Sequence, residues 1–403
     1  MNKKKIIVFG IGNNYFKNKE FLQNRYNVIA LCDNSLDKQG NTTDGFKCIS
    51  PADILTFDFD KIIILPNDFS SIYKQLLQLG IPENKIDTIL DSVCLEACAL
   101  CQLNCKTCYM RKNNAVTVGK GYLTFSNFKN FLLNNMFIKN IELSNNGEIF
   151  LNPDLIHIIK YAFENKVSLT ANNGVNFNSV SDDVLEALEK FKFKNMTISI
   201  DGVTQETYSE YRKNGNVNTV LNNIKRLNYF KIKHNMKFPK LRWQYIIMEH
   251  NENDVIKAKR IAKELGMEIY FKLTWDRDYI PKNTEMLKKE TGLKWLTREE
   301  VPKKGNVLPY ADCYQLFKNP QINWDGRLLG CCCAAYSDFG INVFEVGLEK
   351  ACNSENYSIA KKMVLGEIDA PKNAKNIPCV NCTIYKTMKK ENLYLGIHKE
   401  CKI

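Results

Sequence analysis

Two groups of cysteines, far apart along the chain, are the residues whose types and spacing point most directly to chemistry. Five of the 15 cysteines fall within residues 94–108, and seven more fall within residues 313–382. A high and odd cysteine count in a chain without a secretion-signal pattern argues against a disulfide framework and favours metal or redox chemistry. We therefore expect two separate metal sites.

The first group contains two overlapping triples with the spacing Cys-x3-Cys-x2-Cys: Cys94, Cys98 and Cys101, then Cys101, Cys105 and Cys108. The residues around Cys94 and Cys98 are strand formers, and on a strand these two share one face while Cys101 points to the other. The residues between the later cysteines are polar, so we expect a loop that wraps around a four-iron cluster and leaves one iron open. A zinc knuckle and buried structural cysteines are the alternatives.

The second group supplies four thiols from three predicted loops. Gly326 precedes Cys331 by four intervening residues, and the other members are Cys313, Cys379 and Cys382. Four protein ligands close a [4Fe–4S] cluster and suit it to electron transfer, whereas zinc on the same thiolates would be structural. We expect one auxiliary [4Fe–4S] cluster, with zinc as the alternative. Alternative ligands here are Cys332 and Cys333.

The elements that must position the first group alternate between strands and helices. Apolar strands are predicted near residues 92–100, 139–144, 167–171, 195–200, 241–248 and 267–273, and amphipathic helices near 125–135, 154–165, 181–191, 217–230 and 253–265. This order predicts parallel strands joined by right-handed crossovers in a partly closed barrel, with the chemistry on the loops after the strands. Beyond residue 280 we expect little regular structure apart from an amphipathic stretch at 357–364.

The N-terminal segment has its own strand, turn and helix pattern. Apolar runs at 5–9, 28–32 and 62–65 and a helix at 70–80 predict a small Rossmann-like domain. Gly10 and Gly12 begin a dinucleotide fingerprint, but Tyr15 replaces its third glycine; Asp33 follows roughly 20 residues on, where a ribose-binding acid is expected. We favour a recognition or docking module over nucleotide binding.

Several segments together resemble radical S-adenosylmethionine (SAM) enzymes over roughly residues 90–390. The matching segments are Cys101-Gln-Leu-Asn-Cys105-Lys-Thr-Cys108-Tyr109, Leu143-Ser-Asn-Asn-Gly-Glu148 with Asn146 in place of the first glycine of a Gly-Gly-Glu motif, Asn172-Asn173-Gly174, Ser199-Ile-Asp201-Gly202 and Tyr211-Arg212. The resemblance implies that SAM binds the open iron and is cleaved reductively to a 5′-deoxyadenosyl radical, which abstracts a substrate hydrogen. It also implies an electron donor such as flavodoxin or ferredoxin.

The resemblance further implies which residues bind SAM. Glu148 would accept a hydrogen bond from the amino group, and Arg212 would lie near the carboxylate. Asn173, Ser199 and Asp201 would lie near the ribose. The complete SAM-binding set that the resemblance implies is Tyr109, Asn146, Gly147, Glu148, Asn173, Ser199, Asp201 and Arg212.

The stretch Ile322–Arg327 before Cys331 resembles the hairpin of the SPASM/twitch extension of these enzymes. The expected α/β fold therefore has three domains: Rossmann-like (1–90), partial (β/α)6 barrel (91–280) and SPASM/twitch-like (300–403). The expected reaction is oxidation or rearrangement of a carbohydrate or nucleotide-sugar-like substrate. The alternatives are a peptide-modifying radical SAM maturase and, from another class, a non-catalytic zinc-stabilised binding or redox-sensing protein.

Composition narrows the function classes. The 403 residues are 44% hydrophobic and 25% charged, as in folded globular proteins. The net charge of +12 would suit nucleic acid, but only nine of the 56 basic residues are arginine, and recognition of bases in the grooves favours arginine. No apolar run approaches the ~18 residues of a membrane span. We expect a cytoplasmic protein that binds neither nucleic acid nor membrane.

Overall fold

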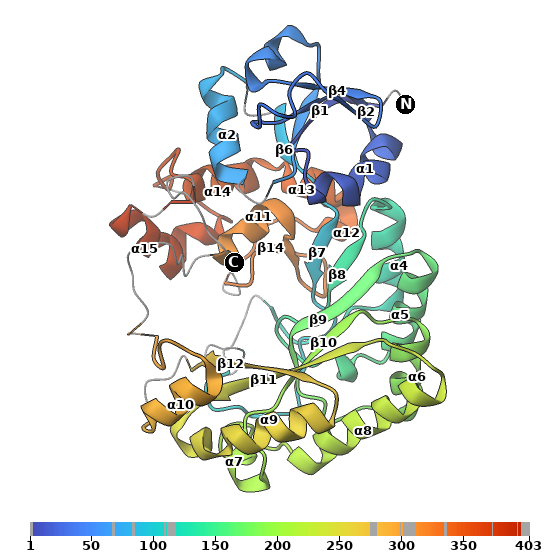
Figure 1. Ribbon diagram of the computed structural model, residues 1–403, viewed down its shortest axis with the longest axis vertical. Coiled ribbons are helices and arrows are strands. Elements are labelled where there is room, and N and C mark those ends of the chain that lie inside the picture. Colours follow the sequence, from blue (N-terminus) through green and yellow to red (C-terminus); the bar gives the residue numbers. More distant parts are fainter. Residues whose placement is uncertain are drawn as a thin grey trace. The chain divides into compact units, whose positions relative to one another are not determined.

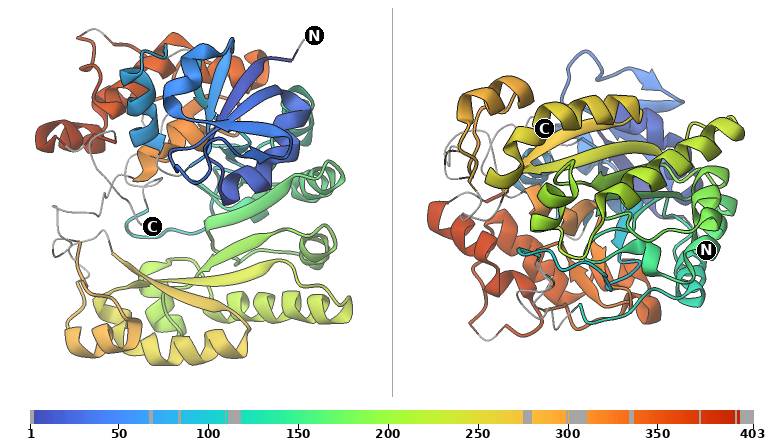
Figure 2. Two further views of the ribbon diagram at one scale, coloured as in Figure 1. Left: turned by 45° about the horizontal axis from the view of Figure 1, so that its top comes forward. Right: turned by 90° about the horizontal axis from the view of Figure 1, so that it is seen from below.

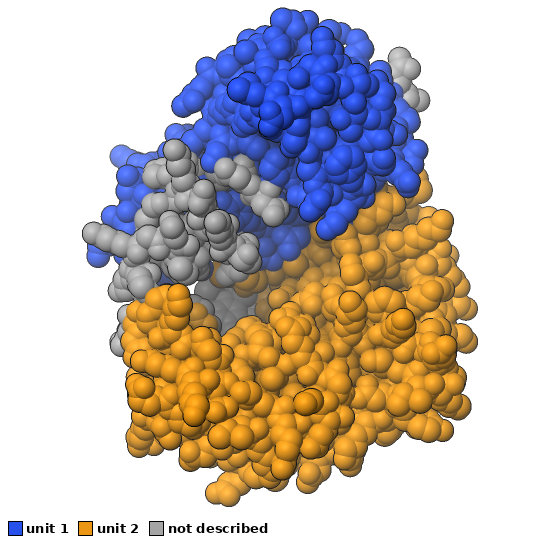
Figure 3. All heavy atoms as spheres, viewed as in Figure 1, with its two compact units in different colours: residues 1–91, 306–319, 355–403 blue, residues 92–305, 320–354 orange. Residues whose placement is uncertain are grey.

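The computed structural model describes most of the chain, which packs as two compact units. The described residues are 3–66, 69–82, 85–108, 110, 118–274, 280–298, 300, 311–333, 337–372, 374–392 and 394–395. Unit 1 comprises residues 1–91, 306–319 and 355–403, and unit 2 comprises residues 92–305 and 320–354 (Figure 3). The three expected domains stay a prediction.

Unit 1 contains a mostly parallel sheet in the order β3-β4-β2-β1-β5-β6. Only the pair β3 and β4 is antiparallel. The strands are β1 (Lys5–Phe9), β2 (Asn27–Cys32), β3 (Thr42–Thr43), β4 (Phe46–Ile49), β5 (Lys61–Ile64) and β6 (Ile86–Thr88), and the helices of this segment are α1 (Asn13–Arg25) and α2 (Phe69–Gln78). The strands predicted at 5–9, 28–32 and 62–65 and the helix at 70–80 are confirmed.

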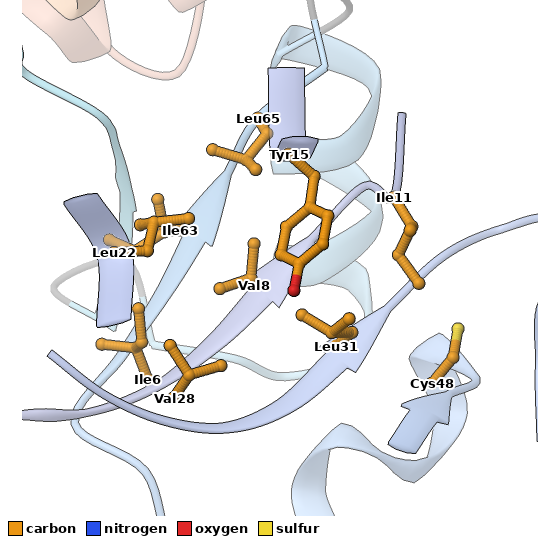
Figure 4. Packing of buried hydrophobic residues seen from close by; sticks show 10 residues of the cluster. All are labelled: Ile6, Val8, Ile11, Tyr15, Leu22, Val28, Leu31, Cys48, Ile63 and Leu65. Carbon is orange, nitrogen blue, oxygen red and sulfur yellow. The ribbon is translucent and has the colours of Figure 1, made fainter. Parts of the chain in front are cut away.

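The core of unit 1 explains the altered dinucleotide fingerprint. Tyr15 is 1% exposed, and its ring lies among the apolar side chains of β1 and β2, beside Val8 and Leu31 (Figure 4). Asp33 Oδ2 accepts hydrogen bonds from the Ile11 backbone N–H at 2.7 Å and from Lys38 Nζ at 2.9 Å. The residue expected to bind a ribose therefore already has partners within the unit.

Unit 2 contains an eight-stranded sheet in the order β12-β11-β10-β9-β8-β7-β13-β14. All neighbouring strands are parallel except β13 and β14. The first six strands are β7 (Ser92–Leu95), β8 (Asn140–Glu142), β9 (Ser168–Val175), β10 (Asn195–Ser199), β11 (Lys240–Ile247) and β12 (Glu268–Leu273). All six predicted strands are present in a mixed α/β fold, but the strand predicted near 92–100 ends at Leu95, so Cys98 lies beyond it.

The predicted helices of unit 2 are confirmed and lie along the outer face of this curved sheet (Figures 1 and 2). They are α4 (Phe125–Asn134), α5 (Leu155–Glu164), α6 (Asp182–Lys190), α8 (Val217–Lys233) and α9 (Val255–Glu264), with the short α7 (Gln205–Tyr211) before α8. Side chains alternate along a strand. Leu241, Trp243 and Tyr245 of β11 are buried on one face, and the other face carries Arg242 and Gln244.

The expectation of little regular structure beyond residue 280 is wrong. β13 (Gln321–Ile322) and β14 (Leu328–Gly330) continue the sheet of unit 2 beside β7. The helices of this region are α10 (Thr284–Thr291), α11 (Gln315–Lys318), α12 (Val343–Val346), α13 (Leu348–Cys352), α14 (Glu355–Leu365) and α15 (Thr383–Glu391). Most are too short to produce a clear hydrophobic period, whereas α14 confirms the stretch predicted at 357–364. Among the described residues, no helix has the length and apolarity to cross a membrane.

Candidate active site

The site is built around the loop that follows β7. Cys94 and Cys98 are 2% and 0% exposed, whereas Cys101 is exposed and Cys105 and Cys108 are partly exposed. The backbone N–H of Cys108 donates to the Cys105 carbonyl at 3.2 Å. The later triple therefore presents accessible sulfur atoms, and the earlier cysteines lie in the packed interior. Tyr109 lies outside the described residues.

Two polar side chains lie beside the sulfur atoms of this loop. Asn176 Nδ2 is 3.6 Å from Cys101 Sγ, and Arg212 Nη1 is 4.0 Å from Cys105 Sγ. Burial raises the pKa of Cys105, whereas the charge of the Arg212 guanidinium lowers it. A cationic guanidinium stabilises thiolates, the form that binds metal. Accessible thiols next to a positive charge fit an iron–sulfur cluster.

The loop that carries Cys101, Cys105 and Cys108 is hydrogen-bonded to the end of α7. The Asn104 backbone N–H donates to the Lys213 carbonyl at 2.9 Å. The Thr107 and Tyr211 hydroxyl oxygens are 2.7 Å apart. These bonds link the loop after β7 to the segment that carries Arg212, so the cysteines and the arginine are positioned together.

Glu148 lies in the interior beneath this loop. The Glu148 backbone N–H donates to the Leu100 carbonyl at 2.8 Å, and its Oε2 accepts from the Asn176 backbone N–H at 2.6 Å. The side chain is 0% exposed, and burial raises its pKa to about 7 although backbone hydrogen bonds and Arg212 lower it. A β-carbon on Gly147 would lie 2.0 Å from the Cys98 carbonyl oxygen. Only glycine allows the two loops to approach this closely.

Asp201 and Arg212 form a buried ion pair. Asp201 Oδ2 accepts from Arg212 Nε at 2.7 Å, and Oδ1 accepts from the Ile246 backbone N–H at 2.7 Å. Burial favours the neutral form of Arg212, but the negative charge of Asp201, together with Cys105 and the neighbouring tyrosines, raises the pKa of the guanidinium. Asp201 therefore holds Arg212 in place and ties the end of β10 to β11.

The remaining predicted SAM contacts lie on neighbouring strands and loops. Ser199 Oγ accepts from Gln244 Nε2 at 3.3 Å, and Asn173 Nδ2 donates to Asn145 Oδ1 at 2.8 Å. Asn146 precedes Gly147 in the loop after β8. Ser199 is the last residue of β10, Asn173 lies near the end of β9, and Asn146 follows β8, so all three lie toward the carboxyl ends of adjacent parallel strands, where α/β sheets place their ligands.

Three polar residues of the site were not predicted from the sequence. Asn176 contacts both Cys101 and Glu148, and Gln244 bonds Ser199. Glu96 is 0% exposed, and burial raises its pKa to about 8. A carboxylate within the otherwise apolar run 92–100 was the available signal for Glu96. Nothing local distinguishes Asn176 and Gln244.

The second cysteine group is divided between the two units. Cys313, Cys379 and Cys382 belong to unit 1, and Cys331 belongs to unit 2. Cys313 Sγ is 3.9 Å from Met388 Sδ. Within the described residues, no three His, Cys, Asp or Glu side chains converge on a single metal ion; ligands of a four-iron cluster bind different irons and stand further apart. The auxiliary cluster stays a prediction.

Comparisons with known proteins bear on parts of the chain. Residues 2–87 match the family model described as C2185-like, N-terminal. No curated protein matches the chain. Among solved structures, BtrN in complex with AdoMet and 2-DOIA aligns with a TM-score of 0.41 and 13% identity, over 74% of this chain and 94% of that one.

Two structures of SuiB from Streptococcus suis align over more of this chain. SuiB bound to S-adenosylmethionine has a TM-score of 0.51 and 14% identity, over 78% of this chain and 77% of that one. SuiB bound to the precursor peptide SuiA has a TM-score of 0.50 and 14% identity, over 78% of this chain and 76% of that one. At this identity the likeness shows a shared fold: the chain has the fold of a protein that binds S-adenosylmethionine.

Proposed function

We propose that this chain is a radical SAM enzyme. The observation that carries the proposal is the joint placement of an accessible Cys101, Cys105 and Cys108 loop, the buried Glu148 and the Asp201-held Arg212 at the carboxyl ends of one parallel sheet. The fold shared with SuiB, whose structure is bound to S-adenosylmethionine, supports it.

The cysteines of this loop would bind the cluster, and the charged side chains would bind SAM. Cys101, Cys105 and Cys108 would hold a [4Fe–4S] cluster, and this cluster supplies the electron that cleaves bound SAM. Glu148, once deprotonated, would accept a hydrogen bond from the SAM ammonium group, and Arg212 would donate to its carboxylate.

Of the remaining predicted SAM contacts, Asn173 and Ser199 lie at the same edge of the sheet. Ser199 and Asn173 would face the ribose. Asp201, also predicted near the ribose, is bonded to Arg212 and would position that side chain. The resemblance adds three further contacts to this set. They are Tyr109, Asn146 and Gly147.

The finer proposal concerns the substrate. We favour oxidation or rearrangement of a carbohydrate or nucleotide-sugar-like compound, with an electron donor such as flavodoxin or ferredoxin. Peptide modification is the second candidate, since SuiB has been solved with the precursor peptide SuiA. One auxiliary [4Fe–4S] cluster on Cys313, Cys331, Cys379 and Cys382 completes the proposal, as an electron-transfer group.

Anaerobic reconstitution tests the central claim. Wild-type protein should bind iron and sulfide and release 5′-deoxyadenosine from SAM when reduced with dithionite. Replacing Cys101, Cys105 or Cys108 by Ala should abolish this release and remove about four irons, the content of one cluster. Cys98→Ala is the matched control, because its buried sulfur should not be a ligand. Stoichiometric zinc without 5′-deoxyadenosine would contradict the proposal and favour a binding or sensing protein.

A separate variant tests the auxiliary cluster. The triple replacement of Cys331, Cys379 and Cys382 by Ala should remove about four further irons. It should still release 5′-deoxyadenosine, because four thiolate ligands leave no iron open to SAM. Iron content equal to that of the wild type would contradict the auxiliary cluster while leaving the SAM site intact.

A further inference from the structure

The sheet of unit 2 has helices α8 and α9 on its outer face (Figure 1). Its inner face carries a row of polar side chains on β10, β11 and β12. Neighbouring strands pair Ser199 with Gln244 and Gln244 with Tyr270, and Arg242 lies one inward-facing position before Gln244 on β11. Because residues two apart on a strand share a face, these side chains point to the same side as Ser199. Ser199 lies at the carboxyl end of this face, where the proposed function places SAM, and Arg242 lies two residues nearer the amino end.

The Arg242 side chain lies against an aromatic ring and makes few polar contacts with the described residues. Its guanidinium carbon is 4.5 Å from the centroid of the Tyr270 ring. Within the described chain, Arg242 Nε is buried and has no hydrogen-bond partner. Among the described residues, Glu268 Oε2 lies 3.5 Å from this Nε, and the side chains of Arg242 and Glu268 are 39% and 71% exposed. A solvated carboxylate at this distance neutralises the guanidinium weakly.

The ring that supports Arg242 is itself fixed. Tyr270 donates its hydroxyl hydrogen to Gln244 Oε1 at 2.9 Å, and Gln244 Nε2 donates to Ser199 Oγ at 3.3 Å. Lys272 Nζ lies 5.6 Å from the same ring centroid. Arg242 and Lys272 therefore lie against the same ring. The planar guanidinium fork matches the oxygens of a carboxylate or a phosphate.

We propose that Arg242, supported by Tyr270 and accompanied by Lys272, is a subsite for an anionic group of the substrate, a carboxylate or a phosphate. The inference rests on the proposed function, because it places the substrate on the face that carries Ser199. It narrows the substrate to an anionic compound. A phosphate would come from a nucleotide-sugar-like substrate, and a carboxylate from an acidic sugar or a peptide.

Anion titrations of the reconstituted protein test this subsite. Inorganic phosphate and acetate are titrated at constant ionic strength, with chloride as the balancing ion, and the heat of binding is measured. Arg242→Gln should weaken binding of the preferred anion at least tenfold. Arg226→Gln is the matched control, since Arg226 pairs with Asp182 on the helical side of unit 2. Stronger binding of phosphate points to a phosphate-bearing substrate, and stronger binding of acetate to a carboxylate.

Equal anion affinity in the wild type and Arg242→Gln, or an equal loss in Arg226→Gln, would overturn the subsite. If Arg242→Gln fails to fold in a thermal melt, Lys272→Gln decides, with an expected loss of several-fold. Release of 5′-deoxyadenosine by wild-type protein is measured in parallel. Absence of that product contradicts the proposed function, whereas unchanged anion binding in the variants contradicts only the subsite.

Discussion

Glu96 and Glu148 are two carboxyl groups that the fold buries completely. Burial raises the pKa of Glu96 to about 8 and the pKa of Glu148 to about 7. Glu148 accepts backbone hydrogen bonds, whereas the described residues offer neither oxygen of Glu96 a hydrogen bond of ordinary geometry. In both, the folded state retains a proton that the unfolded chain releases near pH 4.5. Stability therefore falls as pH rises toward the folded-state pKa.

Glu96→Gln should remove this pH dependence. Between pH 6 and pH 8 the wild type should lose up to ~2.7 kcal/mol of unfolding free energy relative to the variant, at ~1.36 kcal/mol per pH unit. Denaturant unfolding of the two proteins at both pH values measures the difference. Other titrating groups are shared and cancel in it. The same difference at pH 6 and pH 8 would show that Glu96 is already ionised in the fold.

Glu148 should make SAM binding pH-dependent. With a pKa of about 7, the carboxylate that accepts from the SAM ammonium forms mainly above neutrality. The wild-type SAM affinity should therefore rise about tenfold from pH 6 to pH 8, because about a tenth of the groups are ionised one unit below the pKa. Glu148→Gln should bind SAM weakly and equally at both pH values, in titrations of cluster-loaded protein. A pH-independent wild-type affinity would remove Glu148 from this role.

At the scale of elements, the site depends on two loops that pack backbone against backbone. Gly147, in the loop after β8, leaves no room for a β-carbon beside the Cys98 carbonyl, and the next residue, Glu148, bonds Leu100 in the loop after β7. The position of the carboxylate and the position of the cysteine loop are therefore coupled.

Gly147→Ala should separate these loops. The added methyl group would force the backbone apart at a cost of about 1–3 kcal/mol, and SAM affinity should fall while the three cysteines still bind iron. Gly12→Ala is the control, because nothing lies within 4 Å of a β-carbon at that position. Thermal unfolding and SAM titration of both variants give the measurement. Wild-type behaviour of Gly147→Ala would mean that the loops do not pack this closely.

At the scale of the whole molecule, unit 1 is assembled from three separate stretches of the chain. The Phe317 ring of α11 lies 5.0 Å from the Phe69 ring of α2, between ring centroids. Lys361 Nζ of α14 lies 5.6 Å from the same Phe317 ring. One side chain thus links the N-terminal segment to both later segments.

Phe317→Ala should destabilise unit 1 as a whole. Phe317 is 5% exposed, and replacing a buried phenylalanine by alanine costs roughly 3–5 kcal/mol. Phe16→Ala, at a side chain of the same unit that is 53% exposed, should change stability by less than about 0.5 kcal/mol. Denaturant unfolding and limited proteolysis of residues 1–91 report the effect. Equal stability of the two variants would show that α11 does not hold these segments together.

The sequence by itself determined the secondary structure of residues 92–273 and the choice between the two cysteine triples for the proposed cluster. Long helices and strands with a clear hydrophobic period can be predicted from their own residues. The polar residues after Cys101 indicate a loop. Only the tertiary structure decided that Asp201 forms an ion pair with Arg212 and that Glu96 is buried. It also decided that the hairpin after residue 320 extends the sheet beside β7. Burial and pairing of this kind arise from segments distant in the chain, and no local pattern encodes them.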